Sequence, residues 1–248
     1  MMISGFLVAV SFLTVIPVGP RTEIGPGRFA ASMSYFPLVG LLIGLALALM
    51  DFALRGLLPG MVLDVTLVAA LALFTGGLHL DGLADTVDGL IGGRGDREKT
   101  LSVMKDSRIG AMGVVALALL LAMKIAALGG MPAGLRPAAL MLAPAMARWS
   151  QVQVSFGSAA ARGQEGLAGP FIERLRLRNY LVALATLFLM VILARQPRGL
   201  YAFIAVALFA AAAKVFFGRR LGGVTGDTIG AVSEISETLA LFVFLVQA

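Results

Sequence analysis

The chain has 248 residues, of which 59% are hydrophobic and only 14% are charged. A soluble domain of ordinary composition carries about a quarter charged residues, so this composition excludes a soluble domain and indicates a polytopic membrane protein. Cysteine is absent, which excludes disulfides, thiolate metal sites and a cysteine nucleophile. No basic stripe interleaved with aromatic residues accompanies the net charge of +6, so we interpret this charge as a topology signal and expect no nucleic-acid partner.

Apolar segments separated by polar loops follow one another along the whole chain. Seven are predicted to cross the bilayer, namely residues 29–58, 61–80, 109–129, 135–156, 179–194, 200–217 and 229–248. Residues 1–17 are short for a span and would cross, re-enter or lie at the interface. We therefore predict an all-α, polytopic integral membrane helical bundle of seven or eight spans, with one membrane-embedded domain over residues 1–248. Gly40 and Gly44 form a GxxxG pair, which marks a close helix contact or arises by chance in a glycine-rich chain.

Residues 75–113 interrupt the apolar pattern with charges and glycines. Asp81, Asp85 and Asp88 are spaced by four and three residues, which places their carboxylates on one face if the segment is helical. Three such charges repel one another, and a bound Mg²⁺, Mn²⁺ or Ca²⁺ ion would relieve the repulsion. Alternatively, the segment is a solvated loop whose acids pair with neighbouring Arg and Lys. Its many glycines weaken a helix and allow close approach of a ligand, which favours a functional role.

Basic residues are distributed unequally between the alternate loops. One set of loops carries thirteen: Arg21, Arg28, Arg94, Arg97, Lys99, Lys105, Arg108, Arg162, Arg174, Arg176, Arg178, Arg219 and Arg220. The other set carries four: Arg55, Arg136, Arg195 and Arg198. By the positive-inside rule the first set faces the cytoplasm. The acidic stretch, the polar loop 157–178 and the glycine-rich turn 218–228 are thus expected on one side, with Asp227 and Glu234 near the aspartates.

Two basic residues lie within predicted spans. Lys124 and Arg148 are costly there. Such residues either face a functional site, here the acidic cluster or a phosphate, or they point inward and pair with carbonyls, or they snorkel to the interface. His79 is the only histidine and lies beside the acidic stretch. Its role is either structural or in contact with substrate.

Four motifs together resemble the cobalamin synthase family, the adenosylcobinamide-GDP ribazoletransferases. Residues 73–89 resemble L-T-G-G-x-H-L-D-G-L-A-D-T-x-D-G, with Phe74 inserted before Thr75. MKDSRIG at 104–110 and FPLVG at 36–40 are similar to two further family motifs, and GGVTGDTIGA at 222–231, followed by Glu234, is similar to a third. Val15 departs from the pattern because it stands where a basic residue is expected, and RGQEG at 162–166 is one residue longer than the family's R-x-E-G.

The resemblance implies a reaction and a site. The family joins adenosylcobinamide-GDP to α-ribazole or its 5′-phosphate, releasing GMP, and cobalamin is then product rather than cofactor. DTVDG at 85–89, followed by Asp106, is similar to the motif of the CDP-alcohol phosphotransferases, which suggests a distantly similar fold and Mg²⁺ as the cofactor. The implied catalytic residues are Asp81, Asp106, Arg108, Lys124 and Arg148, with Asp81 or Asp106 as the base. The implied metal ligands are Asp81, Asp85, Asp88, Asp106, Asp227 and Glu234, and the implied substrate-binding residues are His79, Gly222, Gly223, Thr225 and Gly226.

Two other functions compete with this interpretation. A CDP-alcohol-type phospholipid head-group transferase is disfavoured because the GGxTGD turn and the HLDG prefix are foreign to its motif. A cation-coupled transporter is disfavoured because the acidic motif is not repeated in the second half and sits at a helix end. The expected partners are the two small-molecule substrates and the lipid bilayer of a bacterial cytoplasmic (inner) membrane. The oligomeric state is left open, a homo-oligomer included.

Overall fold

The computed structural model describes residues 2–18, 25–163 and 169–246, and within these ranges it contains helices and no β-strand. The first half contains α1 (Met2–Leu13), α2 (Pro26–Ser32), the 3₁₀ helix η1 (Met33–Tyr35), α3 (Phe36–Leu54), α4 (Gly60–Phe74), α5 (Leu78–Gly92) and α6 (Arg97–Val103). The second half contains α7 (Ala111–Gly129), α8 (Arg136–Ser155), α9 (Gly169–Ile172), α10 (Leu177–Leu193), α11 (Pro197–Leu221) and α12 (Gly226–Leu245). The predicted all-α class is confirmed.

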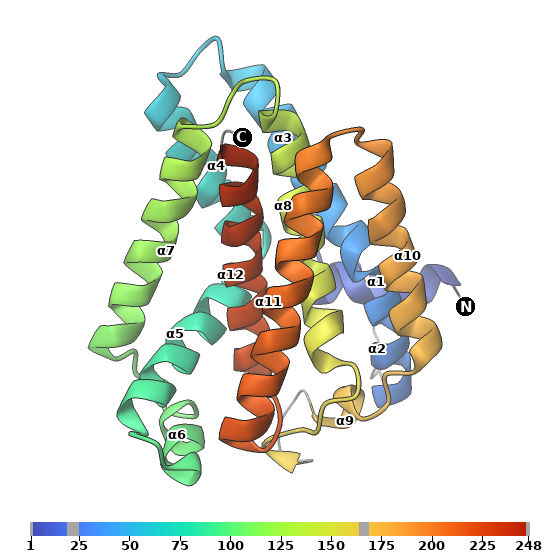
Figure 1. Cartoon of the computed structure of the whole chain (residues 1–248), viewed down its shortest axis with the longest axis vertical. Coiled ribbons are helices and arrows are strands. Elements are labelled where there is room, and N and C mark those ends of the chain that lie inside the picture. Colours follow the sequence, from blue (N-terminus) through green and yellow to red (C-terminus); the bar gives the residue numbers. More distant parts are fainter. Residues whose placement is uncertain (1, 19–24, 164–168, 247–248) are drawn as a thin grey trace.

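Helices α8 and α12 form the inside of the bundle, and α3, α5, α7, α10 and α11 surround them (Figure 1). Most side chains of α8 are buried, whereas α7 and α11 expose rows of Leu, Val and Phe on their outer faces. Long helices with apolar outer faces suit a lipid environment, because a helix satisfies its backbone hydrogen bonds internally and exposes only apolar side chains to the lipid. The protein is therefore a membrane protein.

The glycine pair in α3 marks a close helix contact rather than chance. A Cβ atom on Gly40 would lie 2.7 Å from the Cα of Ala145, and one on Gly44 would lie 2.7 Å from the Cα of Met141. Small residues let two helix backbones approach in this way. The contact holds α3 against α8 along the centre of the bundle.

The predicted span 61–80 is wrong as a continuous helix. The chain bends by 90° between α4 and α5, and Gly76 and Gly77 adopt φ angles of 61° and 71° at the break. Glycine adopts this left-handed conformation without the steric cost of a side chain. The acidic residues consequently lie on a separate helix, α5, and its glycines do not prevent that helix from forming.

Four described helical segments are long and apolar enough to cross a membrane, or five if the bent pair α4–α5 counts as one span. Helix α10 is apolar but shorter, and α8 ends in the polar sequence RWSQVQVS. The predicted number of seven or eight spans is not reached by this measure and stays a prediction.

The three polar segments expected on one side do meet at one end of the bundle (Figure 1). Arg97, at the start of α6, donates to the carbonyl oxygens of Leu221 at 2.7 Å and Ala161 at 2.8 Å. Ala160 and Val224 form an isolated parallel bridge between the polar loop and the glycine-rich turn. The prediction that these loops share an end is confirmed.

Candidate functional site

The acidic face of α5 crosses the beginning of α12 at very short range. A Cβ atom on Gly82 would lie 2.9 Å from the carbonyl oxygen of Asp227, so only glycine permits this approach. Asp85, one turn further along α5, interacts electrostatically with Asp81, Asp88 and Asp227. The structure thus brings the three predicted aspartates of α5 and the aspartate of the second motif to one place.

Local sequence explains how Asp227 comes to this position. Helix α11 ends at Gly222, whose φ of 71° is the left-handed conformation that often terminates helices. A Cβ atom on Gly223 would collide with the carbonyl oxygen of Ala159, so glycine allows the turn to lie against the polar loop. Thr225 then caps α12, since its hydroxyl accepts from the backbone N–H of Thr228 at 3.1 Å. The turn therefore aims the first residues of α12 toward α5.

Asp88 has a structural role that the sequence did not suggest. One of its carboxylate oxygens accepts from the backbone N–H of Gly110 at 2.7 Å, and the other from that of Gly113 at 2.8 Å. The first N–H groups of a helix have no partner within it, so Asp88 caps the start of α7. Its predicted role as a metal ligand stays a prediction, and both of its oxygens already hold backbone hydrogen bonds.

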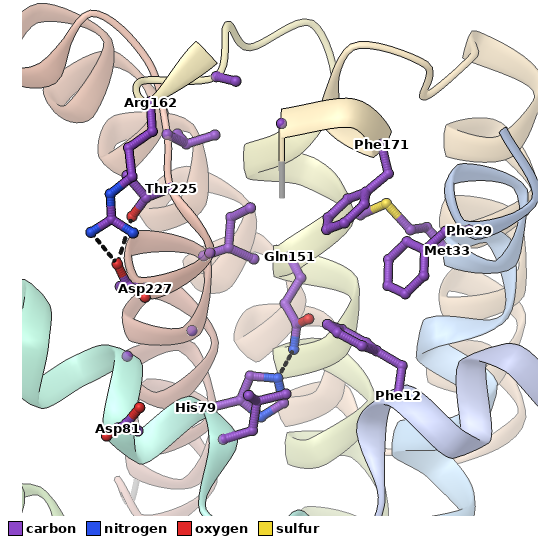
Figure 2. A pocket seen from close by; sticks show the side chains of 18 of the residues that line it. Phe12, Phe29, Met33, His79, Asp81, Gln151, Arg162, Phe171, Thr225 and Asp227 are labelled. Atoms are coloured by element: carbon purple, nitrogen blue, oxygen red, sulfur yellow. Dashed lines mark hydrogen bonds and ion pairs between the residues drawn. The ribbon is translucent and has the colours of Figure 1, made fainter. Parts of the chain in front are cut away.

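A cavity of about 330 Å³ opens beside this crossing. Figure 2 shows that its polar side carries Asp81 from α5, Thr225 and Asp227 from the glycine-rich turn, and Arg162 from the polar loop. Arg162 and Asp227 form an ion pair at 2.9 Å. Predicted substrate residues His79, Thr225 and Gly226 all line the cavity, whereas Gly222 and Gly223 support the turn behind it. Glu165 belongs to the same RGQEG motif as Arg162 and lies outside the described residues.

The opposite side of the cavity is an aromatic wall that sequence reasoning missed. We define it as Phe12 of α1, Phe29 of α2, Phe36 of α3 and Phe171 of α9. The rings of Phe12 and Phe29 meet edge to face with centroids 4.6 Å apart, and Phe29 and Phe171 lie 4.2 Å apart. These residues come from four different helices, of which α9 is far from the others in sequence, and only Phe36 belonged to a motif that the sequence singled out.

His79 lies at the floor of the cavity and takes part in a chain of hydrogen bonds. The side-chain amide nitrogen of Gln151 lies 2.9 Å from Nε2 of His79 and 2.9 Å from the hydroxyl of Ser233. The hydroxyl of Ser233 donates to the carbonyl oxygen of Ala147 at 3.2 Å. His79 is only 3% exposed. It lines the cavity with that small surface, and the buried Gln151 holds its ring in place.

Lys124, Arg148 and Glu234 form a separate buried network with Glu237. Lys124 Nζ lies 2.6 Å from Glu234 and 2.6 Å from Glu237, and Arg148 lies 2.7 Å from Glu237. None of these four is among the described residues that line the cavity. The structure therefore places the two intramembrane bases inside the bundle, between α7, α8 and α12, where they pair with carboxylates rather than with the carbonyl groups of the alternative interpretation. Their predicted roles at phosphate, and that of Glu234 at a metal, stay predictions.

Asp106 and Arg108 pair with each other in the loop between α6 and α7. The guanidinium of Arg108 bonds both carboxylate oxygens, the shortest contact being 2.7 Å, and its side chain is 87% exposed. Hydrogen bonds from Arg108 lower the pKa of Asp106 to about 2, and the same contact raises the pKa of Arg108. Asp106 is therefore firmly ionised in this arrangement.

The carboxylates fit a hard divalent cation in part. Among the described residues, no three acidic or imidazole groups lie close enough together to form a ready metal site. Mg²⁺ is usually held by one or two carboxylates together with waters and substrate phosphates. Asp81 and Asp227 line the cavity and Asp85 interacts with both, so these three can offer oxygen ligands, with one oxygen of Asp227 already paired with Arg162. Both oxygens of Asp88 and both of Asp106 hold other partners.

Comparison with known proteins gives one consistent result. The family model described as cobalamin-5-phosphate synthase matches residues 5–245. The adenosylcobinamide-GDP ribazoletransferase of Geotalea daltonii is 46% identical over 95% of this chain and 94% of its own length. The proteins of the same name from Syntrophobacter fumaroxidans and Pseudomonas paraeruginosa are 41% and 38% identical, each over 96% of both chains. No solved structure matches the chain.

Proposed function

The chain belongs to the cobalamin-5-phosphate synthase family, and from that premise we propose how its cavity carries out the transfer named in its relatives. The protein is an enzyme of cobalamin biosynthesis, a transferase that acts on adenosylcobinamide-GDP and α-ribazole. What remains to be assigned is which residues of this chain do the chemistry. The observation that carries the assignment is the convergence of Asp81, Asp227 and Arg162 on one cavity.

The reaction that we assign to this cavity is a displacement at phosphorus. A ribose hydroxyl oxygen of α-ribazole, one that is also free in its 5′-phosphate, forms a bond to the phosphorus attached to cobinamide. The bond from that phosphorus to the bridging oxygen of the diphosphate breaks, and GMP leaves with the bonding electron pair. The hydroxyl proton passes to a carboxylate, for which we propose Asp81. Asp106 is less suited because a good base has a pKa near the working pH, and Arg108 holds that of Asp106 at about 2.

Phosphoryl transfer asks a protein mainly for positioning and for neutralisation of charge. We propose that Asp81, Asp85 and Asp227 hold Mg²⁺ together with the diphosphate, and that the bound cation supplies charge neutralisation for the phosphate oxygens. Arg162 already pairs with Asp227 at 2.9 Å. It is therefore placed to exchange that partner for a phosphate oxygen when the substrate enters. Arginine suits this exchange because its planar fork matches both carboxylate and phosphate.

A single assay tests this proposal. Purified protein is given adenosylcobinamide-GDP, α-ribazole and Mg²⁺, and release of GMP is followed together with formation of adenosylcobalamin. We expect both products in equal amounts, loss of activity with EDTA, and recovery when Mg²⁺ is restored. Full activity after EDTA treatment would contradict the metal assignment and leave the transferase activity standing.

We further propose that the cavity opens to the cytoplasm of a bacterial inner membrane, which the unequal distribution of basic loop residues supports. Cysteine scanning can test this cleanly because the chain has no cysteine. Glu98 at the cavity end and Gly134 at the other end are both exposed. A side chain added at Gly134 would meet no atom within 4 Å of its Cβ, so a cysteine fits there. With an impermeant thiol reagent added outside intact cells, Gly134→Cys is expected to be labelled and Glu98→Cys is not. The reverse pattern would invert the orientation.

A further inference from the structure

The aromatic wall has no part in phosphoryl transfer, yet it forms one whole side of the cavity. Phe12 is 36% exposed, and Phe29 and Phe171 are partly buried and pack against the core, so that part of each ring surface is left to line the cavity. Phe36 lies behind them, stacked on Phe12 with centroids 5.9 Å apart. Figure 2 shows the rings of Phe12, Phe29 and Phe171 across the cavity from Asp81 and Asp227. A wall of this kind binds a flat apolar group by stacking and burial.

We infer that the aromatic wall binds the alkylated benzimidazole base of α-ribazole, and so sets which base the enzyme accepts. The inference rests on the proposed function, because it assumes that α-ribazole enters this cavity. It assigns one substrate to one side of the site: the base lies against the phenylalanines, and the ribose reaches toward the carboxylates. The nucleophilic hydroxyl is then delivered to the side where Asp81 lies.

Size and polarity separate this base from the other two ring systems of the reaction. A cavity of about 330 Å³ is near the lower end of the range of about 300–1,000 Å³ for small-molecule sites, which suits a nucleoside and not a corrin macrocycle with its amide arms. Guanine carries donors and acceptors along its edge, and burying them unpaired is costly. The phenylalanine rings offer no such partners, whereas the dimethylated benzimidazole of a riboside has no N–H or O–H group and only one ring nitrogen that accepts.

The residue between the wall and the histidine favours a sugar at the centre of the cavity. Because the hydroxyl of Ser233 donates to Ala147, it must accept from the Gln151 amide nitrogen, which fixes the orientation of that amide. The second N–H of this nitrogen is directed to His79. Figure 2 shows the amide oxygen of Gln151 on the side of Phe12. A fixed acceptor at this place fits a ribose hydroxyl.

The test compares a variant that removes a ring with one that keeps it. Phe12→Leu is expected to raise KM for α-ribazole at least about tenfold, the size expected when a stacking surface is lost, with KM for adenosylcobinamide-GDP unchanged. Phe12→Tyr keeps the ring and is expected to raise this KM less than Phe12→Leu does. Phe52→Leu is the matched control, because Phe52 is 72% exposed on α3 and away from the cavity.

A second measurement reports the base itself. With ribosides of dimethylated and unmethylated benzimidazole, we expect Phe12→Leu to bring the ratio of the two kcat/KM values closer to one, a change that mere loss of folded protein would not produce. If wild type releases GMP with α-ribazole but Phe12→Leu leaves KM and this ratio unaltered, the inference is overturned and the proposed function stands. A raised KM for adenosylcobinamide-GDP instead would also overturn it, since the wall would then hold the other substrate. If wild type shows no transfer at all, it is the proposed function that fails.

Discussion

The two ends of the bundle each hold a group of aspartates, and they differ in how the charge is balanced. At the end away from the cavity, Asp51 and Asp64 are 1% and 3% exposed. Arg136 bonds both of them and also donates to the carbonyl oxygen of Leu128 at 2.7 Å. Arg55 adds a second contact to Asp51 at 2.8 Å. Each buried carboxylate there has a basic partner.

At the cavity end the balance is reversed. Asp81, Asp85 and Asp227 lie together and are only partly buried or exposed, and among the described residues their ion pair is the one between Asp227 and Arg162. A buried charge is tolerated when it is paired, so the matched end ties helices together. An excess of accessible carboxylate is tolerated where water and a ligand can compensate it. The two ends therefore differ within one chain: one cluster is balanced by basic partners, and the other is the cluster proposed above to bind Mg²⁺ and substrate.

The largest expected effect is on stability at the matched end. Arg136→Met leaves Asp51 and Asp64 buried without their shared partner, and removing one side of a buried pair costs about 3–5 kcal/mol. We expect a clearly lower midpoint of thermal unfolding in detergent. Arg55→Met is the control, because the Arg55 side chain is 46% exposed and an exposed pair contributes about 0–1 kcal/mol. Equal shifts for the two variants would remove the distinction between buried and exposed partners.

The next effect is on catalysis at the cavity end. Asp81→Asn and Asp227→Asn keep the shape and remove the charge, and each is expected to lower kcat by about two orders of magnitude, or about 2.7 kcal/mol of barrier. Unlike Arg136→Met, they are expected to leave the unfolding midpoint near that of wild type. Raised Mg²⁺ is expected to restore part of a ligand defect and none of the loss of a base. Glu98→Gln, an exposed acid on α6, serves as the control, and turnover within about a factor of two of wild type for Asp227→Asn would make Asp227 structural.

Much of this arrangement could be predicted from local pattern. The spacing of Asp81, Asp85 and Asp88 placed them on one helix face, and loop charge placed the glycine-rich turn at the same end. Both are short-range properties of the chain, carried by helix periodicity and by alternation of spans. The GxxxG pair in α3 was a signal of the same kind, but only the structure shows that α8 is what it contacts.

The partners of buried charges could not be predicted in the same way. Lys124 and Arg148 were recognised as costly, yet which acids they meet depends on how α7, α8 and α12 rotate against one another. Glu237, which bonds both of them, was not singled out. The aromatic wall is hidden for the same reason, because it is assembled from four elements that share no sequence pattern. The 90° break before α5 had a signal in Gly76 and Gly77, but that signal does not specify a bend.

A smaller effect is expected at Asp88, which belongs to the acidic face and also caps α7. Asp88→Asn keeps one acceptor oxygen and loses the other, so the hydrogen bond to Gly110 or to Gly113 is lost. We expect the free energy of unfolding to fall by about 1 kcal/mol. Asp85→Asn is the comparison, since Asp85 has no such bond to α7 among the described contacts. If the two variants have equal unfolding midpoints, the cap contributes nothing measurable and Asp88 belongs with the binding cluster alone.

The smallest expected effect tests whether Asp81 or Asp106 takes the proton of the attacking hydroxyl. If Asp81 takes it, Asp106→Asn leaves the pH profile of kcat/KM unshifted. Arg108 lowers the pKa of Asp106 to about 2 through its hydrogen bonds, below the usual value of about 4. The ionised form is thus favoured in the folded protein, and any stability gained is present above that usual value and lost as the pH falls through about 2. Between about pH 5 and 9, where kcat/KM can be measured, the charge of Asp106 does not change.

Asp106→Asn is therefore expected to leave the acid limb of the pH profile within about 0.3 pH units of wild type, whatever it does to the rate. Arg108→Gln is a second variant for the same test, because it lets the pKa of Asp106 return toward its ordinary value of about 4. That value still lies below the measured pH range, so the acid limb is again expected to stay in place. A displaced acid limb in Asp106→Asn would mean that substrate separates Asp106 from Arg108 and that Asp106, not Asp81, takes the proton.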